Sequence, residues 1–279
     1  MMFNMHIPIN SSSTFIFIDG SYFCFYRYHS LLNWWKNAYP EEPLADPFQS
    51  QKFVDKFTKT FIENVEEIPK KLGLHKENTK PILIAGKDCK RENIWRTKIF
   101  PQYKGTRVKE DGFMGGPFFK MAYDDNLFEK GGVKAVLKHP KLEADDCIAI
   151  SVKQVLIKYP DAQIYIITSD KDYLQLAKDN VQIYSLAYKK LTEQKSSTGN
   201  PECDLFCKIV MGDISDNIKS VLKKCGPKTA LKCYENRVYF DEKMKSENAY
   251  ELYKMNETLV DFNKIPQELV DEFLGSNPL

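Results

Sequence analysis

The sequence predicts an α/β fold, in which a central, mostly parallel sheet carries helices on both faces and is followed by a helical region. Short apolar segments typical of buried strands alternate with helical periodicity up to about residue 195, and only helical patterns follow Ser196. Parallel sheets bind ligands beyond the carboxyl ends of their strands. The side chains that follow each strand are therefore the first candidates for a functional site.

The first part of the chain contains two apolar strands with a helix between them. Segment 13–20 (STFIFIDG) is rich in aromatic and β-branched residues, and Asp19 lies at its end. From Phe53 to Leu72 apolar residues recur every three or four positions, which predicts an amphipathic helix. Segment 81–86 (PILIAG) is the second strand, and Asp88 follows two residues after it.

A second helix and two further strands complete the predicted sheet. The helix runs from about Asp145 to Tyr159, and strands are expected at 163–170 (QIYIITSD) and 181–186 (VQIYSL). The first of these strands ends at Asp170. Because parallel strands end at one edge of the sheet, Asp19, Asp88 and Asp170 should gather there. The acidic start of the helix can join them.

The remaining chain is predicted to be helical, which divides the protein into an α/β core over residues 1–195 and a helical region over 196–279. Helices are expected at 201–211 and from Pro227 onward, joined by the turn GDISDN and a lysine-rich loop. Within the core, the glycine-bearing segment 108–117 (VKEDGFMGGP) is expected to be flexible.

Charge is distributed unevenly along a chain whose sum is nearly neutral. The 279 residues carry a formal net charge of +2 and are 43% hydrophobic and 28% charged, which are ordinary values for a globular protein. Residues 87–109, however, contain eight basic and two acidic side chains, and residues 217–232 contain five lysines and no acid. Two basic blocks of this kind indicate a polyanionic partner that is held at two places.

The cysteines indicate a reducing compartment. Their number is seven and their spacing is irregular, which argues against a disulfide framework. Cys203 and Cys207 lie four apart, but no second Cys or His pair stands nearby to complete a zinc site, so they are interpreted as core thiols. The sequence shows neither a signal peptide nor a long apolar segment, and the expectation is a cytoplasmic protein with no membrane contact.

Acidic side chains collect at the predicted strand ends and in the turns near them. A cluster of carboxylates without His or Cys selects Mg²⁺ or Mn²⁺ over zinc. Two such ions about 4 Å apart can bind a phosphodiester, generate hydroxide and stabilise the departing oxygen. The predicted ligands of the two ions are Asp19, Asp88, Glu143, Asp145, Asp146, Asp170, Asp172, Asp213 and Asp216.

Each acidic segment also has an ordinary structural explanation. KLEADDCIAI at 141–150 can be an acidic helix start, TSDKDYLQL at 168–176 a capping loop, and GDISDN at 212–217 an Asx-type turn. A shared site is favoured because the segments recur at corresponding structural positions. The basic blocks supply the phosphate-bearing partner that such a site would need.

Four ordered segments resemble the signature blocks of the flap endonuclease and 5′ nuclease family. They are FIDGSY, LEADDCIAI, TSDKDYLQL and GDISDNIKSVLKKCGPKTA, and the resemblance covers roughly residues 14–274. The segment IWRTKIFPQYKGTR is most similar to the phage ribonuclease H branch, which removes RNA primers. The resemblance implies a PIN/5′ nuclease-like fold and a Mg²⁺-dependent 5′–3′ exonuclease or flap endonuclease acting in replication or repair.

The resemblance also assigns roles to individual residues. Asp19, Asp88, Glu143, Asp145 and Asp146 would hold the first metal ion or its waters, and Asp170, Asp172, Asp213 and Asp216 would complete the second-metal side. Many relatives place an Asp directly after the second strand, where this chain has Ala85 and Gly86. Arg96, Lys104 and Arg107 match basic residues of the family's arch, here about 87–125, that contact the scissile phosphate. Lys104 and Arg107 would share one face if this segment is helical.

Residues 220–229 match the helix-hairpin-helix region that grips duplex phosphates in the family. The corresponding residues are Ser220, Lys223, Lys224, Gly226, Lys228 and Thr229. The usual Gly-x-x-Gly-x-Gly loop reads SVLKKCG here, one residue longer and with only Gly226 retained. This departure puts the K⁺ ion bound by relatives in doubt.

Three functions compete at this point. The first is a structure-selective nuclease, a monomer that acts on DNA or RNA–DNA duplexes with a 5′ end or flap and works beside replication proteins. The second is a catalytically silent DNA-binding protein, which the intact set of acids argues against because those acids repel phosphates. The third is a PIN-type ribonuclease, which the helical block 213–230 argues against.

Overall fold

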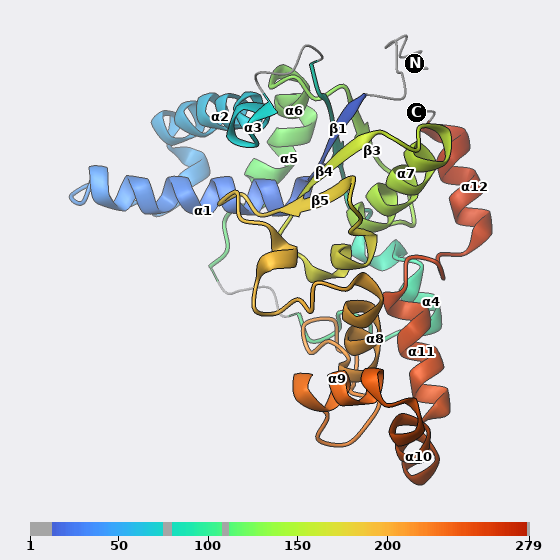
Figure 1. Ribbon diagram of the computed structural model, residues 1–279. Helices are drawn as coiled ribbons and strands as arrows, with labels where there is room; N and C mark the ends of the chain where they lie inside the picture. The colour runs from blue at the N-terminus through green and yellow to red at the C-terminus, as the bar shows by residue number, and fades with distance from the viewer. Residues whose placement is uncertain (1–12, 75–79, 108–111, 278–279) are drawn as a thin grey trace.

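A five-stranded parallel sheet forms the centre of the computed structural model, which describes residues 13–74, 80–107 and 112–277 (Figure 1). The strands are β1 (Thr14–Asp19), β2 (Ile82–Gly86), β3 (Ala135–Leu137), β4 (Gln163–Ile167) and β5 (Val181–Tyr184). Their order is β3-β2-β1-β4-β5, and every pair is parallel. The predicted fold class is confirmed.

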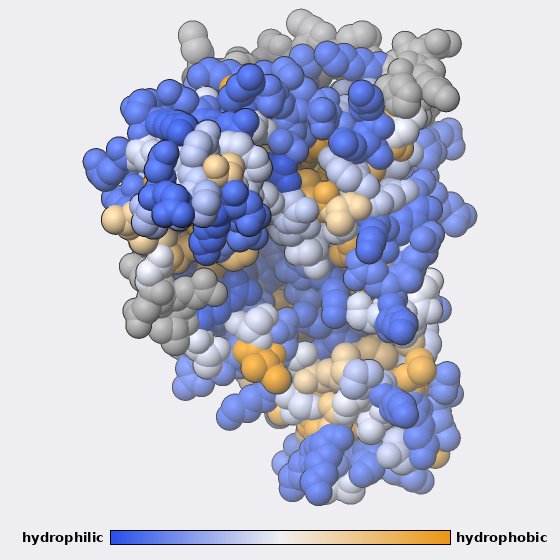
Figure 2. All heavy atoms as spheres, turned by 90° about the vertical axis from the view of Figure 1, so that its left-hand side faces the viewer, coloured by the Kyte–Doolittle hydropathy of each residue, from blue (hydrophilic) through white to orange (hydrophobic). Residues whose placement is uncertain are grey.

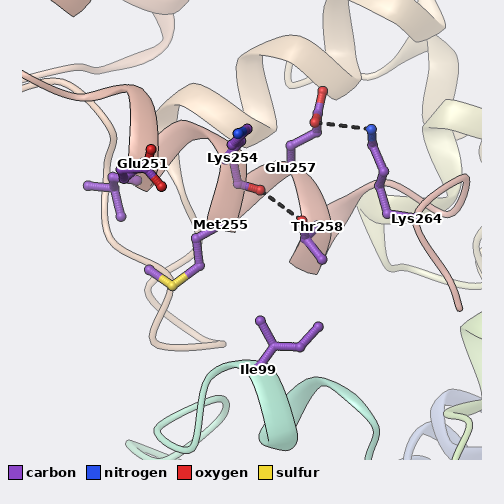
Figure 3. Close-up of a pocket in the computed structure, with 8 residues that line it drawn as sticks. Ile99, Glu251, Lys254, Met255, Glu257, Thr258 and Lys264 are labelled. Atoms are coloured by element: carbon purple, nitrogen blue, oxygen red, sulfur yellow. Dashed lines mark hydrogen bonds and ion pairs between the residues drawn. The ribbon is translucent and has the colours of Figure 1, made fainter.

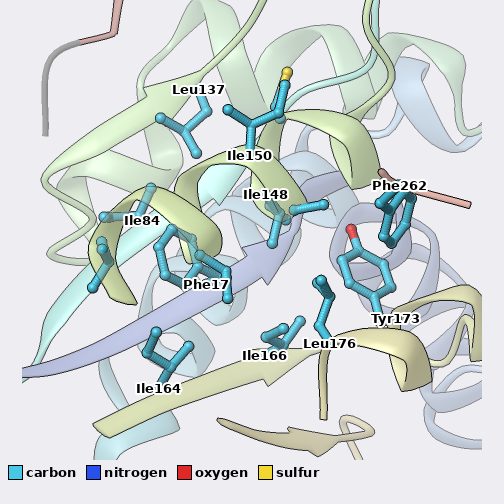
Figure 4. Close-up of a cluster of buried hydrophobic side chains, with 14 of the residues drawn as sticks. Phe17, Ile84, Leu137, Ile148, Ile150, Ile164, Ile166, Tyr173, Leu176 and Phe262 are labelled. Atoms are coloured by element: carbon cyan, nitrogen blue, oxygen red, sulfur yellow. The ribbon is translucent and has the colours of Figure 1, made fainter. Parts of the chain in front are cut away.

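The central strand β1 is buried on both faces, which explains why its sequence is continuously apolar. Phe15 and Phe17 point into a core that includes Ile148 of α7 (Ala144–Lys158) and Phe273 of α12 (Gln267–Ser276). Figure 4 shows Phe17 beside Ile148 in this cluster. Alternate β1 side chains point into the opposite core, formed with α1 (Gly20–Ala38), α2 (Gln51–Glu66), α5 (Gly116–Asp124) and α6 (Leu127–Lys130). Helices therefore cover both faces of the sheet.

Short elements complete the α/β body. They are 3-10 helices η1 (Pro47–Gln49), η3 (Arg91–Asn93), η4 (Lys171–Leu176) and η5 (Leu191–Glu193), and one-turn helices α3 (Ile68–Lys71) and α4 (Arg96–Ile99). On the face turned toward the viewer in Figure 2, hydrophilic residues predominate and the surface is recessed between this body and the helices below it.

The helical region has its own core but does not include the end of the chain. Helices α8 (Pro201–Met211), α9 (Pro227–Glu235), α10 (Arg237–Glu247) and α11 (Tyr250–Val260) surround buried residues such as Phe206 and Met244. Cys203 and Cys207 are buried there, as expected for core thiols. After α11 the chain returns, and α12 packs on α7 in the core of the sheet. Helix α12, which lies beyond the predicted boundary near residue 196, thus packs against the α/β body.

Several local predictions differ from the structure. Helix α1 and the short strand β3 were not predicted from the sequence, and β4 ends at Ile167, three residues earlier than expected. Residues 101–106 form consecutive turns in place of a helix, and Lys104 has a left-handed φ of 54°. In the segment 108–117 that was predicted to be flexible, residues 108–111 lie outside the described residues.

One shallow groove lies between α4 and α11. Ile99 faces Met255 and Thr258 across it, and an ion pair of 3.2 Å joins Glu257 to Lys264 at its side (Figure 3). The residues that line it include none of the predicted site residues. Separately, among the described residues no helix has the length and apolar character needed to cross a lipid bilayer.

Candidate metal centre and nucleic-acid interface

The carboxyl edge of the sheet brings three of the predicted acids together. The carboxylate of Asp19 at the end of β1 accepts hydrogen bonds from the backbone N–H of Tyr22 and the hydroxyl of Thr168. Asp88 follows β2 and accepts from Ser21 Oγ at 2.5 Å and from the N–H of Ala144 at 2.8 Å. Strands β1 and β4 are neighbours at which the strand order reverses, so this is the edge where a ligand is expected.

Electrostatics confirm that these acids are close. Burial, together with the negative charges of Asp88 and Asp170, raises the pKa of Asp19 to about 7, although the hydrogen bonds from Tyr22 and Thr168 act in the opposite direction. Asp88 and Asp170 are themselves exposed, so they face solvent on either side of Asp19. Asp88 therefore lies in the acidic group although it stands two residues beyond its strand.

The acidic start of α7 combines a helix cap with a buried ion cluster. The backbone N–H of Glu143 donates to Asp146 Oδ2 at 3.2 Å, an arrangement typical of a helix N-terminus. Asp146 is fully buried and also accepts from Trp95 Nε1 at 2.9 Å. The ordinary explanation of KLEADDCIAI as a helix start is thus correct, but it accounts for only part of the acidic cluster.

Arg96 compensates the buried acids of α7. Its guanidinium donates to Asp146 Oδ1 and Oδ2 at 2.8 Å, to Glu143 Oε2 at 2.9 Å and to the carbonyl of Leu259 at 2.7 Å. Arg96 is only 2% exposed. Four of its five N–H donors are bonded to buried acceptors, so Arg96 compensates the acids of α7, which differs from its predicted role as a contact of the scissile phosphate.

Asp145 differs from its two acidic neighbours because it forms no ion pair among the described residues. Carboxylate oxygens of Glu143, Asp145 and Asp146 approach one another within 4.8 Å. Burial raises the pKa of Asp145 well above its usual value, and the charges of Asp146 and Glu143 add to this effect. A divalent cation would relieve this repulsion.

A second acidic group belongs to η4 and the turn after α8. Carboxylate oxygens of Asp172, Asp213 and Asp216 lie within 4.8 Å of one another. Gly212 ends α8 with a φ of 71°, and a Cβ there would meet the carbonyl of Ile218 at 2.4 Å. Only glycine fits this turn, which directs Asp213 back toward the sheet.

Lys208 of α8 enters this second group. Its ammonium lies 2.7 Å from Asp172 Oδ1 and also binds Asp213. The lysine affects the two carboxyls differently. At Asp172, burial and the charge of Asp170 outweigh the effect of Lys208, so the pKa rises to about 6. At Asp213, burial raises the pKa, but Lys208 and Ser215 lower it more strongly, and the result is about 2.

Asp216 joins the two groups. The hydroxyl of Tyr103 lies 3.2 Å from both Asp216 Oδ2 and Glu143 Oε2. The ammonium of Lys104 binds Glu143 and lies 4.0 Å from Asp216 Oδ2, and Arg107 Nη2 lies 2.5 Å from Asp216 Oδ1. Lys104 and Arg107 thus meet at one place without a helix, because a turn closed by the Arg107 N–H to Lys104 carbonyl bond of 3.1 Å brings them together.

Negative charge exceeds positive charge across the two groups and the sheet edge. Five of the nine predicted acids form ion pairs among the described residues, and their partners are four cationic side chains, namely Arg96, Lys104, Arg107 and Lys208. Such an excess raises carboxyl pKa values and favours cation binding. The donors are oxygen atoms only, so the arrangement fits hard divalent cations.

The predicted duplex-binding segment presents lysines at the start of α9. Lys223, Lys224 and Lys228 are exposed, and Gly226 is the N-cap of α9, whose first N–H groups have no side-chain cap. Ser220 differs from its predicted role, because its hydroxyl lies within hydrogen-bonding distance of the carbonyls of Val210 and Leu222. It supports the turn instead of offering a free donor.

Two contributors to the site were not predicted. Lys208 in α8 stands five residues before Asp213, which follows the helix, and this spacing could have indicated an ion pair around the helix end. Tyr103 carries no comparable signal, because its two acidic partners lie 40 and 113 residues away.

Arg96→Met is expected to lower the free energy of unfolding by roughly 3–5 kcal/mol, because it leaves Glu143 and Asp146 buried without their cation. Lys98→Met is the matched control, since Lys98 lies two residues away on α4 but is exposed. Urea denaturation of both variants measures the difference. Equal stabilities would contradict the structural role of Arg96.

Asp19→Asn is expected to stabilise the metal-free protein more at pH 8 than at pH 5. Because its pKa is raised in the folded state, Asp19 contributes stability at low pH that is lost as pH rises through about 7. Asn has no charge to lose but can still act as the N-cap of α1. Denaturation in EDTA should show a gain of roughly 1–4 kcal/mol at pH 8. If the variant and the wild type differed in free energy of unfolding by the same amount at both pH values, the raised pKa of Asp19 would be refuted.

Comparison with known proteins places the chain in a family. Residues 14–200 match the model of the 5′-3′ exonuclease, N-terminal resolvase-like domain. Ribonuclease H of enterobacteria phage T4 is 33% identical over 155 residues, which are half of each chain. A 5′-3′ exonuclease of Buchnera aphidicola is 28% identical over 235 residues, covering 81% of this chain and 71% of that protein.

Solved structures share the fold. Bacteriophage T5 5′-exonuclease with bound zinc superposes with a TM-score of 0.64 at 20% identity, covering 94% of this chain and 97% of that one. A variant of the bacteriophage T5 flap endonuclease, solved as a pseudo-enzyme-product complex with DNA and metal ions, gives a TM-score of 0.63 at 18% identity with the same coverage. The family model matches well over half of the chain, and its residues include seven of the nine acids described above. The chain belongs to the 5′-3′ exonuclease family.

Proposed function

We propose that this protein is a structure-selective 5′ nuclease that hydrolyses phosphodiester bonds in DNA or RNA–DNA duplexes with two Mg²⁺ or Mn²⁺ ions. The observation that carries the proposal is the excess of acids at the carboxyl edge of the sheet, nine against four cations in contact with them. Family membership supports the reaction class, and the all-oxygen donor set supports the choice of metal.

The first metal group consists of Asp19, Asp88, Glu143, Asp145 and Asp146, with Asp145 as a direct ligand. Glu143 and Asp146 serve it indirectly, because Arg96 and Lys104 already bind their carboxylates. The second group consists of Asp170, Asp172, Asp213 and Asp216. When bound, the ions polarise the phosphate and lower the pKa of the attacking water.

The side chains around these groups orient the substrate. Lys104 and Arg107 border the acids, and a phosphate held there would accept hydrogen bonds from both. The exposed lysines Lys223, Lys224 and Lys228 and the N-terminus of α9, with Thr229 in its first turn, grip the duplex backbone. This division assigns cleavage to the sheet edge and duplex docking to the helical region.

The expected biological setting is DNA replication or repair in the cytoplasm, with a monomer that acts on 5′ ends, flaps or RNA primers beside replication proteins. One relative is a ribonuclease H and another is a 5′-3′ exonuclease, which supports RNA-primer removal as one activity. The silent DNA-binding alternative is disfavoured, because unneutralised acids such as Asp145 would repel phosphates without a catalytic benefit.

The test is cleavage of end-labelled flap, nicked, single-stranded and RNA-primed duplexes with Mg²⁺ or EDTA. Products released from the 5′ end in Mg²⁺ alone are expected. Asp145→Asn should lower cleavage by on the order of 10³ or more while circular dichroism and DNA binding stay near wild type. Asp161→Asn, an exposed acid before β4, is the control. Full activity of Asp145→Asn would remove the metal assignment.

Lys104→Ala should lower the single-turnover rate by on the order of 10² with a much smaller change in substrate Kd. A cation that meets charge developing on the phosphate stabilises the transition state more than the ground state. Single-turnover kinetics and binding isotherms measured on the same flap substrate separate the two effects. A loss of affinity equal to the loss of rate would make Lys104 a docking contact.

A further inference from the structure

Lys208 is a cation built into the second acidic group. Its ammonium lies 2.7 Å from Asp172 and binds Asp213, so one lysine links η4 to the turn after α8. Its side chain is 21% exposed, and the carboxylates of Asp172 and Asp213 are 13% and 19% exposed. This is a largely enclosed ion cluster, in which removal of one partner has a large effect.

The first acidic group also holds a lysine, but the two lysines are anchored differently. Lys104 comes from a turn outside any helix, where it has a left-handed backbone. Lys208 lies three residues before the end of α8, and its neighbours Cys207 and Ile209 are buried in the cores around that helix. The backbone of Lys208 is therefore fixed, and only its side chain can leave the group.

A divalent cation and the ammonium of Lys208 need the same oxygen atoms. In a partly buried site the ammonium repels a divalent cation beside it, and it takes up negative charge of Asp172 and Asp213 that the ion would use. Binding of the ion by these two carboxylates therefore favours departure of the ammonium. The long, flexible lysine side chain can swing toward solvent at a modest cost.

We propose that Lys208 is an internal counterion of the second acidic group, which holds Asp172 and Asp213 together when no divalent cation is bound and leaves them when one binds. This inference rests on the metal-dependent function proposed above. It implies that the affinity for the second ion is lowered by the displacement of Lys208. The lysine is a positioning residue, and its effects should appear without any nucleic acid.

The first experiment measures Mn²⁺ binding to the full chain by calorimetry and by electron paramagnetic resonance, with no nucleic acid present. Lys208→Met removes the charge and should tighten the weaker of two sites by roughly tenfold. The same variant should unfold at a lower temperature in EDTA and gain more from Mn²⁺ than the wild type does. Lys208→Arg, which keeps the charge, should behave as the wild type in EDTA.

Lys59→Met is the matched control, because Lys59 forms an exposed ion pair of 3.8 Å with Glu63 on α2. It should change neither Mn²⁺ binding nor the response of the unfolding temperature. Unchanged or weaker Mn²⁺ binding by Lys208→Met would overturn the inference. Absence of Mn²⁺ binding in the wild type would instead overturn the proposed function itself.

A second measurement uses the wild-type protein, so it does not depend on the folding of a variant. Acetic anhydride acylates exposed, neutral amines, and mass spectrometry reports the extent at each lysine. Acylation of Lys208 should increase several-fold on addition of Mn²⁺, whereas acylation of Lys59 should stay constant. Equal reactivity of Lys208 with and without Mn²⁺, under conditions in which binding is measured, would show that it is not displaced.

Discussion

The buried contact between Arg96 and the carboxylates of α7 is the interaction on which the rest of the site depends. One guanidinium satisfies Asp146, Glu143 and the carbonyl of Leu259 at the end of α11. It therefore joins the segment after β2, the acidic helix start and the helical region at one point. Burying three charges together is costly unless each is hydrogen-bonded, and here each is.

This compensation divides the acids into two kinds. Glu143 and Asp146 are bound by cations of the protein, and Asp213 is bound by Lys208. Asp145 has no ion-pair partner among the described residues, and burial and neighbours of the same sign raise the pKa of Asp19. The acids that the protein leaves uncompensated are those best placed to bind ions from solution. Structural and chemical roles can thus be separated within one cluster of identical side chains.

The sequence predicted the sheet and the gathering of acids well, because both follow from local patterns. Buried strands such as 81–86 are continuous apolar segments, and parallel strands must end at one edge. It did not predict α1, whose aromatic-rich sequence lacks a clean polar face, or β3, which has three residues. The role of Arg96 could not be predicted, because its burial depends on Leu259, which lies 163 residues away. Charge alone made this arginine resemble a phosphate ligand.

The return of the chain to the sheet after α11 has a consequence for the order in which the protein can fold during synthesis. Phe273 of α12 and Phe262 before it complete the core on the α7 face of β1. Domains usually fold from the N-terminus as they leave the ribosome. Here the strands and α7 emerge long before α12 does, so the part of this core that Phe262 and Phe273 cover stays open until α12 is made. During that interval its apolar side chains are available for contacts with other unfolded segments.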